Sequence, residues 1–560
     1  MHYEYITTED KARAAVESLV QQSCIGIDVE TTGLDPRTSR VRLLQAAAIN
    51  GQVAVFDLDQ VPVDLLRPLS AVEWATFNGQ FEYQHLSHLG MDIPRMHDAM
   101  LLDRLVSGRI HSLGDVAGID KAEQKSDWSG ELSDSQIHYA AADPLVTIRL
   151  VSQMLPLVPR TVYDLWRDVI PVLAASTMSG QNFDWAAHSV LLDGWKQEQE
   201  RLLAAVHEYM PDVENIRSSK QLGEWLQNNL PEDVLAKWPR TGKGALKTDM
   251  NTWQLYADLP VIAPLVKYKQ VNKLITAYGD GYSKFRHILT GNLHPQYHIG
   301  RTVTGRLACS NPNVQNPPRE SWFRELFAAP EGMTLVSADF SQIELRVAAL
   351  LSNDFNMIDS YAAGIDLHAK TAAAVAGVPL SRVTKKQRQA AKPVNFGTLY
   401  GQRAPSLAST AKTSYGVDMT VDEAQLALSQ FSRAYPQLSQ WQRKMRRQAS
   451  ESRQVVSRSG LVRDFDVQGG GYIAGEAVNM PVQASAAEVL MASLKRLSRS
   501  LYGTVHDEIT LVVPNDEAGA AAAELEAAMQ EGFLEVFPEG SALLPGLVEV
   551  SQGSNWAEIH

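Results

Sequence analysis

The chain has very little cysteine: Cys24 and Cys309 are the only two in 560 residues. Two thiols far apart in the sequence argue against a disulfide framework and against a cysteine-rich zinc site. This usage fits a reducing compartment, and we expect a cytoplasmic location. The sequence does not open on a basic segment followed by an apolar stretch, and it lacks an apolar run of the roughly 18 residues that a membrane span needs. We therefore predict neither a signal peptide nor a membrane span.

Basic residues are also in deficit. The sequence has 51 Lys and Arg against 64 Asp and Glu, a formal charge of −13, which by itself argues against a nucleic-acid coat protein or a polybasic membrane binder. The deficit is not uniform, because residues 381–463 contain 15 basic and 4 acidic residues, a local charge of +11. This excess predicts a basic wall that holds a phosphate backbone. Its members include Arg443, Lys444, Arg446, Arg447, Arg453, Arg458 and Arg463.

The length exceeds one compact core, and the content of 45% hydrophobic and 21% charged residues is typical of folded proteins, so we expect two or more domains. Within residues 24–58, alternating apolar side chains and turn residues predict a sheet that begins with a hairpin. Helical spacing from about 98 to 150 makes this first unit α/β. Prolines at 156, 159 and 171 predict a connection, after which residues 190–290 are predicted to be mainly helical.

Asp28 and Glu30 lie two residues apart on the first predicted strand, so both side chains leave the same face. Paired carboxylates repel each other unless a proton or a cation separates them, and hard oxygen ligands favour Mg²⁺ or Mn²⁺. Such a pair on an exposed strand is usually only solvated. Two further blocks strengthen the metal interpretation: Asn78-Gly79-Gln80-Phe81-Glu82 and Tyr139-Ala140-Ala141-Ala142-Asp143.

Together these blocks resemble the 3′–5′ exonuclease domain shared by family A DNA polymerases and ribonuclease D-like enzymes. The resemblance extends over residues 1–155 and includes Asp120-Lys121 and the Gln-Lys-Ser-Asp-Trp segment at 124–128. It implies a ribonuclease H-like fold with two metal ions, which activate a water and stabilise the departing 3′ oxygen. The residues that it assigns to the site are the metal ligands Asp28, Glu30, Glu82 and Asp143, and Tyr139, which orients the attacking water.

Glu82 departs from the family pattern, which usually has Asp at this position. The extra methylene moves the carboxylate by roughly a bond length in a site that tolerates about 0.5 Å. Either proofreading is weakened, or Glu82 reaches the second metal after a small backbone adjustment.

Two further acidic blocks occur in the second half. Asp339 follows the apolar run Thr334-Leu335-Val336 and precedes a helical pattern, so we expect it at a strand end. Asp507 and Glu508 are predicted near the tip of a hairpin with apolar flanks. Adjacent acids in an exposed turn are common, but the apolar flanks favour a site in which the acids have a partner.

Between these blocks, Arg388, Lys392, Phe396 and Tyr400 recur at four-residue spacing. On a helix this spacing places two cations and two aromatic rings along one stripe. Cations suit a triphosphate and aromatic faces suit a base. Pro393 lies inside the stripe, so either the helix kinks there or it begins near Pro393 and Arg388 belongs to another segment. We expect the kink.

These blocks resemble the palm and fingers motifs of family A DNA polymerases, the bacterial DNA polymerase I group, over about residues 160–560. Further matching segments are Ser219–Leu222, Thr304–Leu307, Asn311–Asn316 and Asn479–Gln483. The implied architecture is an α/β multidomain chain with a right-hand polymerase domain at 156–560. Its subdomains would be a mostly helical thumb at about 190–300, a palm at about 301–370 and 471–560, and fingers at about 371–470.

The resemblance also implies functional residues. Asp339 and Asp507 would hold two Mg²⁺ ions, with Mn²⁺ as a possible substitute, and Glu508 would support them. The primer 3′-hydroxyl attacks the α-phosphate of a deoxynucleoside triphosphate in such a site. The nucleotide-binding residues would be Arg388, Lys392, Phe396, Tyr400, Gln342 and Glu344, and the DNA-binding residues Arg306, Asn479, Gln483, His506 and Lys220.

Three residues bear on specificity. Glu344 would close the space beside the sugar 2′ carbon, which predicts discrimination against ribonucleotides. Phe396 lacks the hydroxyl that a Tyr would place near the sugar 3′ position, which predicts discrimination against dideoxynucleotides. The family often carries Arg where this chain has Gly475, so a template or primer contact is missing here or supplied elsewhere.

Primer–template DNA and deoxynucleoside triphosphates are the expected partners of a monomeric enzyme, and the sequence leaves open whether a helicase or processivity factor takes part. Because Met1 lies just ahead of the exonuclease block, we expect no 5′-nuclease domain, an arrangement that resembles a bacteriophage or other viral replicative enzyme in the host cytoplasm. Three alternatives stay open: a single-subunit RNA polymerase, a ribonuclease D-like exonuclease with a nucleic-acid-binding C-terminal half, and a non-catalytic replication accessory. Glu344 argues against the first, and the acidic blocks against the last.

Overall fold

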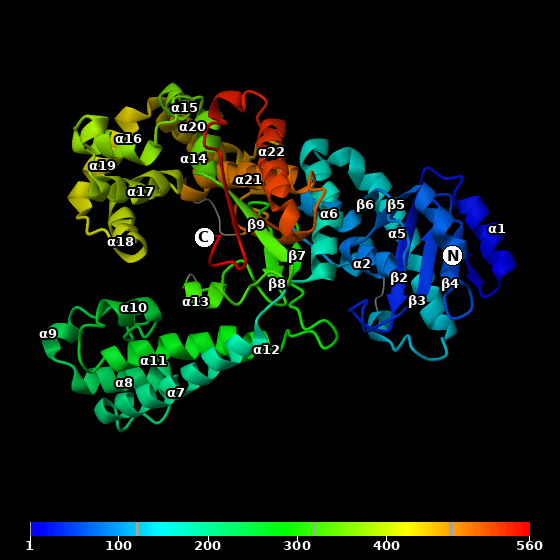
Figure 1. Cartoon of the computed structure of the whole chain (residues 1–560), viewed down its shortest axis with the longest axis horizontal. Coiled ribbons are helices and arrows are strands. Elements are labelled where there is room, and N and C mark those ends of the chain that lie inside the picture. Colours follow the sequence, from blue (N-terminus) through cyan, green and yellow to red (C-terminus); the bar gives the residue numbers. More distant parts are fainter. Residues whose placement is uncertain (1, 119–121, 319, 470–473, 560) are drawn as a thin grey trace.

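The computed structural model describes residues 2–118, 122–318, 320–469 and 474–559. The Asp120-Lys121 pair therefore lies outside the described residues. Figure 1 shows an N-terminal α/β unit, a central sheet, and two helical units that extend away from this sheet on the side opposite the N-terminal unit. In the described part of the chain, every helix is either too short or too polar to cross a membrane.

The N-terminal unit contains a six-stranded sheet in the order β1-β4-β3-β2-β5-β6. The predicted strands are present, and β2 and β3 pair antiparallel. The sequence pattern missed the short β1, which pairs parallel with β4 at the sheet edge. The strands are β1 (Glu4–Ile6), β2 (Cys24–Thr31), β3 (Val41–Ala47), β4 (Val53–Asp57), β5 (Glu73–Thr76) and β6 (Met96–Asp98). The helices are α1 (Glu9–Leu19), α2 (Gln80–His88), α3 (Ala99–Ser107), α4 (Leu113–Ala117) and α5 (Asp134–Met154), with 3₁₀ segments η1 (Val63–Ala71) and η2 (Ala122–Lys125).

The connection after this unit is shorter than the prolines predicted. A 3₁₀ turn, η3 (Leu155–Leu157), leads directly into the 20-residue helix α6 (Arg160–Ser179), which continues through Pro171. The prediction of a connection at Pro171 was therefore wrong. The buried side of α6 includes Tyr163 and Trp166, and α6 packs against α2 and α3 as well as α21 and β12. Packing of this apolar side compensates for the backbone donor that proline lacks.

The first helical unit has its own hydrophobic core, which includes the buried Trp225 and Trp253. Its helices are α7 (Trp185–Tyr209), α8 (Ser219–Asn229), α9 (Glu232–Leu235), α10 (Met250–Leu255), α11 (Ala263–Lys273) and α12 (Asp280–Ser283), with the π-helical segment η4 (Leu274–Gly279) before α12. The prediction of a mainly helical region at 190–290 is confirmed.

The central sheet has four antiparallel strands in the order β12-β13-β9-β14. These are β9 (Met333–Phe340), β12 (Leu501–Val505), β13 (Glu508–Pro514) and β14 (Val548–Gly553). The helix α22 (Ala518–Val536) packs on the sheet and on α21 (Ala474–Leu494), and α21 packs on α14 (Ile343–Ser352). A small hairpin of β7 (Gln296–His298) and β8 (Ala308–Ser310), the helix α13 (Ser321–Arg324), and 3₁₀ turns η6 (Asn515–Glu517) and η7 (Gly540–Leu543) complete this region.

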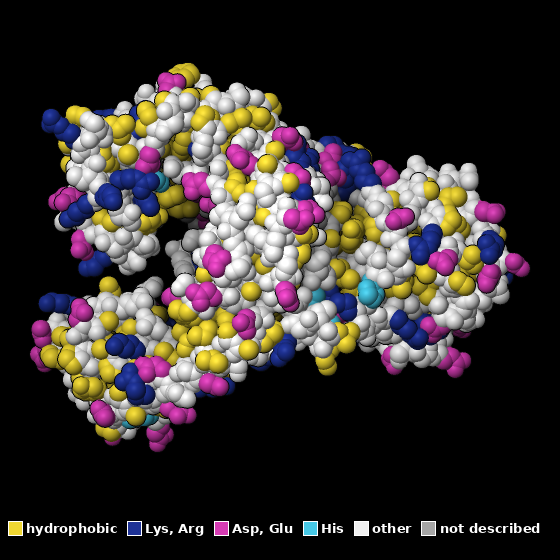
Figure 2. Space-filling view, viewed as in Figure 1, with side chains coloured by type: hydrophobic (Ala, Val, Ile, Leu, Met, Phe, Trp, Pro, Cys, Tyr) yellow, Lys and Arg dark blue, Asp and Glu magenta, His cyan; other side chains and the backbone are white. Residues whose placement is uncertain are grey.

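The second helical unit carries the basic stretch of the sequence. Its elements are α15 (Phe355–Ala362), α16 (Leu367–Ala376), η5 (Leu380–Arg382), α17 (Lys385–Leu399), α18 (Ala404–Tyr415), α19 (Val421–Ala434), α20 (Pro436–Ser452), β10 (Gln454–Val456) and β11 (Val462–Asp464). Figure 2 shows a hollow between this unit and the first helical unit.

Candidate active sites

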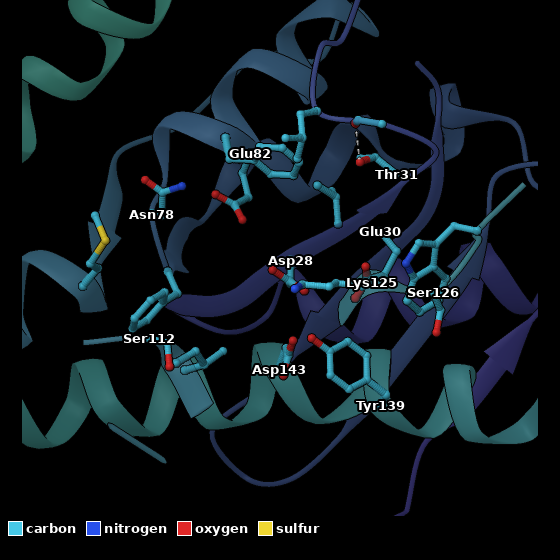
Figure 3. Close-up of a pocket in the computed structure, with 18 of the residues that line it drawn as sticks. Asp28, Glu30, Thr31, Asn78, Glu82, Ser112, Lys125, Ser126, Tyr139 and Asp143 are labelled. Carbon is cyan, nitrogen blue, oxygen red and sulfur yellow. Dashed lines mark hydrogen bonds between the residues drawn. The ribbon is translucent and has the colours of Figure 1, made fainter. Parts of the chain in front are cut away.

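The first acidic cluster lies on the N-terminal sheet. Strand β2 presents Asp28 and Glu30, and helix α5 brings Asp143 toward them (Figure 3). One carboxylate oxygen from each lies within 4.8 Å of the others. The prediction that Asp28 and Glu30 point from the same face of one strand is therefore confirmed. The fold adds a third acid, Asp143, from more than 100 residues away in the sequence.

This cluster lines a cavity of about 570 Å³. Tyr139 stands one helical turn before Asp143 on α5 and also faces the cavity (Figure 3). Burial, followed by the charges of Asp143, Glu30 and Asp28, raises the pKa of Tyr139, so its hydroxyl keeps its proton. Tyr139 can therefore donate a hydrogen bond to a group in this cavity.

Glu82 enters the same cavity from α2, and its carboxyl group points toward Asp28 (Figure 3). Its side chain is buried, and burial together with the charges of Asp28 and Asp98 raises the pKa of Glu82 well above its ordinary value. Four carboxyl groups in one cavity favour protonation of at least one of them unless a cation is present. This all-oxygen donor set suits a hard divalent ion such as Mg²⁺ or Mn²⁺.

The second acidic cluster lies at the end of the central sheet. Asp339 occupies the penultimate position of β9, and Asp507 lies in the turn between β12 and β13. Glu508 begins β13 directly opposite Asp339 in the antiparallel register. The predicted strand-end and hairpin positions are confirmed, and only the tertiary pairing brings the two blocks together.

A fourth acid, Glu549, belongs to this cluster although the sequence pattern does not indicate it. It lies on β14 opposite Asp339, so Asp339 has an acidic neighbour on each flanking strand. Burial and the charges of Asp507, Glu508 and Glu549 raise the pKa of Asp339 to about 7. Burial also raises the pKa of Asp507. An isolated Glu in Val548-Glu549-Val550 has no sequence signal that distinguishes it from an ordinary exposed strand residue.

Glu508 is oriented by polar neighbours. The Ser337 hydroxyl donates to its Oε1 at 2.5 Å, the Thr510 hydroxyl at 3.0 Å and the Trp556 indole at 3.4 Å. Its side chain is buried. Three donors on one oxygen hold the carboxylate in place, whereas Asp339 is exposed and Asp507 is partly exposed.

The stripe of cations and aromatics lies on α17. The helix begins at Thr384, whose hydroxyl forms a capping box with Gln387, and it continues through Pro393 to Leu399. Arg388 therefore lies on the same helix as Lys392 and Phe396, and the alternative that placed it on another segment was wrong. Tyr400 is the C-cap residue.

Arg388 and Phe396 of the stripe already have partners. Arg388 pairs with Asp366 at the N-terminus of α16. The Phe396 ring lies 5.7 Å from the His368 ring between centroids. Arg388 is therefore held beside α16 and would have to exchange one anion for another to bind a phosphate.

Glu344 joins three parts of the fold. It is buried at the start of α14 and forms an ion pair with Arg306, and the Tyr400 hydroxyl donates to its Oε2 at 3.2 Å. Burial and the Asp507 charge raise the pKa of Glu344, while Arg306 and Tyr400 lower it. The end of α17 therefore lies beside the acids of the sheet. Gln342, the residue before α14, accepts a hydrogen bond from Tyr361 at 3.2 Å.

A second cavity, of about 300 Å³, adjoins these acids. Arg306, Gln483, His506 and Asp507 all line it. Asn479 lies one turn before Gln483 on α21. The structure does not bring Lys220 to this cavity: Lys220 lies on α8 of the first helical unit, with its side chain 84% exposed.

Close packing explains why position 475 is occupied by glycine. A Cβ atom at this position would lie 2.9 Å from the carbonyl oxygen of Tyr400, closer than real Cβ contacts allow. Gly401 meets Gly475 in the same way, since its Cβ would lie 2.8 Å from the Gly475 Cα. The turn after α17 therefore packs directly on α21, and a larger residue at 475 requires a different packing of these helices.

Part of the predicted basic wall is paired with acids in the structure. Arg453 and Arg458 pair with Asp466 and Glu539, each at 3.0 Å. Arg463 is buried and pairs with Glu476 at 3.0 Å. These three cations would have to exchange an acidic partner for a phosphate, so their part in the basic wall stays a prediction. On α20, Arg443, Lys444 and Arg447 are exposed, line a hollow with Trp441, and take part in none of the ion pairs found among the described residues.

Comparisons with known proteins give family matches for both the N-terminal unit and the rest of the chain. The sequence model of DNA polymerase family A matches residues 188–558, and that of the 3′–5′ exonuclease matches residues 3–159. DNA polymerase I of Aquifex aeolicus is 28% identical, over 95% of this chain and 96% of the relative. The thermostable DNA polymerase I of Thermus aquaticus is 32% identical, over 70% of this chain and 47% of the relative. The chain thus spans nearly all of the first relative but about half of the second.

Among solved structures, the POL domain of Pol1 from M. smegmatis, in complex with DNA primer-template and dNTP, has the same fold, with a TM-score of 0.83, 22% identity and complete coverage of both chains. The extent of the polymerase match does not favour a single-subunit RNA polymerase or a ribonuclease D-like enzyme with a binding module. A phage or viral origin stays a prediction, because the relatives named here are bacterial. The chain belongs to DNA polymerase family A and is a DNA polymerase with a 3′–5′ exonuclease domain.

Proposed function

We propose that the protein copies a DNA template by adding deoxynucleotides to a primer 3′ end at Asp339 and Asp507, and proofreads at the cluster of Asp28, Glu30 and Asp143. The observation that carries this proposal is the meeting of Asp339 and Asp507 at one end of the central sheet, beside the end of α17. The second cluster lies in a separate cavity of the N-terminal unit.

Each site would hold two Mg²⁺ ions, on Asp339 and Asp507 in one and on Asp28, Glu30, Glu82 and Asp143 in the other. When bound, the ions supply activation of the attacking oxygen and neutralisation of the leaving group. Mn²⁺ fits the same donor set.

The residues of the chain bind and orient the substrates. Arg388 and Lys392 would bind the triphosphate, with Arg388 leaving Asp366 to do so. Phe396 and Tyr400 would stack near the new base pair, and Glu344 would occupy the space beside the sugar 2′ carbon. Gln342 would line the same nucleotide site, and Glu508 would support the acids. Support comes from the bond between Tyr400 and Glu344, which places the end of α17 next to the sheet.

DNA would be bound by two groups of residues. Arg306, Asn479, Gln483 and His506 would contact the primer end or its minor groove, and Lys220 would contact the backbone from α8. The exposed cations of α20 would add a contact with the phosphate backbone. Support comes from the shared cavity of Arg306, Gln483 and His506 next to Asp507.

In the exonuclease site, Tyr139 would orient the attacking water by donating a hydrogen bond to it. The carboxyl group of Glu82 points toward Asp28 (Figure 3), which supports a role at the second metal. The rate at which Glu82→Asp shortens a single strand tests whether the Glu82 carboxylate reaches that metal.

We also propose domain limits of 1–155 for the exonuclease and 156–560 for the polymerase. The first helical unit would be the thumb, the central sheet the palm and the second helical unit the fingers. The enzyme would act as a monomer in the cytoplasm. The two free cysteines are compatible with a reducing compartment.

The test is extension of a labelled primer on a DNA template with Mg²⁺ and four deoxynucleotides, repeated without nucleotides. We expect extension in the first case and 3′ shortening in the second. Asp339→Ala should abolish extension and keep shortening, and Asp28→Ala should do the reverse. Asp10→Ala, an exposed acid on α1, is the control for loss of one negative charge. Full extension by Asp339→Ala would overturn the polymerase assignment.

A further inference from the structure

The loop between β7 and β8 contributes to both cavities. Arg301 lines the exonuclease cavity of about 570 Å³ together with the four acids. Thr302, Thr304 and Arg306 line the cavity of about 300 Å³ beside Asp507. A loop that belongs to the polymerase domain in the sequence therefore forms part of the wall of the exonuclease site.

The backbone on both sides of Arg301 is held in place. Arg104, a buried residue of α3 in the exonuclease unit, donates from Nε to the carbonyl oxygen of Gly300 at 2.8 Å and from Nη2 to that of Thr302 at 3.3 Å. Gly300 has a φ of 74° and packs so closely on Trp166 that a Cβ would lie 3.1 Å from that ring. The position of residue 301 is thus determined by contacts that do not involve its side chain.

The side chain of Arg301 is exposed and has no ion pair or hydrogen bond within the described residues. Among the described residues that line the exonuclease cavity, Lys125 is the one other Lys or Arg, against four carboxyl groups. Arg301 also lines an adjoining hollow of about 430 Å³ with Arg104 and Arg109. The cation therefore stands between an acidic cavity and a basic surface.

A DNA strand whose 3′ end reaches Asp28 and Asp143 brings one negative charge per phosphate into this acidic environment. A guanidinium group recognises phosphate oxygens in pairs and keeps its charge at all relevant pH values. We propose that Arg301 binds the phosphodiester backbone of the single DNA strand whose 3′ end occupies the exonuclease cavity, and so favours that cavity over the polymerase cavity. This inference rests on the proposed exonuclease function.

The test compares Arg301→Ala and Arg301→Lys with the parent enzyme in the full chain. The substrates are a single-stranded oligonucleotide and a matched primer–template, and the salt concentration is varied. Arg13→Ala, on the exposed side of α1, is the control for the loss of one positive charge. We expect Arg301→Ala to raise KM for hydrolysis of the single strand about tenfold, the size expected for one hydrogen bond between charged groups, with kcat nearly unchanged.

The salt dependence identifies the contact. In Arg301→Ala, the slope of log KM against log salt should fall by about 0.7, the value for one phosphate contact on a single strand. Arg301→Lys should keep most of the slope, and extension of the matched primer should be unchanged in both variants. An unaltered KM and slope in Arg301→Ala would overturn the proposal, as would a loss confined to kcat.

Failure of the exonuclease proposal gives a different result. If the parent enzyme does not shorten DNA with Mg²⁺, equilibrium binding of the same single strand in EDTA replaces KM as the readout. A smaller salt slope in Arg301→Ala then supports the phosphate contact even without hydrolysis, and equal slopes reject it.

Discussion

Glu488 offers a prediction whose size follows directly from the structure. It lies on α21 with 2% of its surface exposed. The Ser457 hydroxyl donates to one of its oxygens, and the Ser459 N–H donates to the other at 3.0 Å. Burial raises the pKa of Glu488 to about 7, although these hydrogen bonds act in the opposite direction. The carboxyl group thus connects the loop after β10 to the helix that carries Asn479 and Gln483.

The sign of the pH effect follows from the raised pKa. Below pH 4.5 the carboxyl group is protonated in both the native and the unfolded state, so its ionisation does not lower the free energy of unfolding. Between the ordinary value of 4.5 and about 7, the native state keeps a proton that the unfolded state has released, so the free energy of unfolding falls as pH rises. The shift corresponds to about 3 kcal/mol, since one pKa unit equals about 1.4 kcal/mol. Above pH 7 the free energy of unfolding is lower by this full amount.

Glu488→Gln removes this ionisation. The amide cannot accept at both positions, so we subtract about 1 kcal/mol for one weakened hydrogen bond. The variant should be about 2 kcal/mol more stable than the parent at pH 8 and nearly equal to it at pH 5. The assay is denaturant-dependent hydrogen exchange of peptides from α21, because a chain of several domains has no single unfolding transition. Glu526→Gln, an exposed residue of α22, is the control. A stability difference that is the same at pH 5 and pH 8 would refute the reasoning.

Three substitutions test the specificity residues. Glu344→Ala opens the space beside the sugar and should raise ribonucleotide relative to deoxynucleotide incorporation about a hundredfold in kcat/KM; an unchanged ratio places the discrimination elsewhere. Phe396→Tyr adds a hydroxyl and should narrow the preference for deoxynucleotides over dideoxynucleotides by about tenfold or more, whereas equal use of both by the parent would contradict the premise. Glu82→Asp should increase the rate of single-strand shortening about tenfold if Glu82 is misplaced, and an unchanged rate shows that Glu82 already reaches its position.

Local signals in the sequence were sufficient for several features of the sites. The alternation along β2 places Asp28 and Glu30 on one face, because side chains repeat every two residues in a strand. The apolar run before Asp339 indicates a strand end, and four-residue spacing aligns Arg388 with Phe396 on α17. These features depend on neighbours within a few residues, so periodicity alone can reveal them.

Other features depend on residues that are distant in the sequence. Glu549 becomes an acidic neighbour of Asp339 only through strand pairing. Arg463 counts as a free cation in the sequence, but in the structure it is buried and pairs with Glu476. Net charge over a segment cannot distinguish cations that face solvent from those that acids neutralise.

The sequence by itself determined the family resemblance, the two acidic sets and the helix that carries the basic–aromatic stripe, because each is encoded in short segments with a fixed period. Only the tertiary structure decided that Tyr400 reaches Glu344, that Gly475 must be small beneath the turn after α17, and that Arg301 faces the exonuclease cavity. These contacts join segments that are distant in the chain, and their geometry depends on how helices and loops pack, which no local pattern specifies.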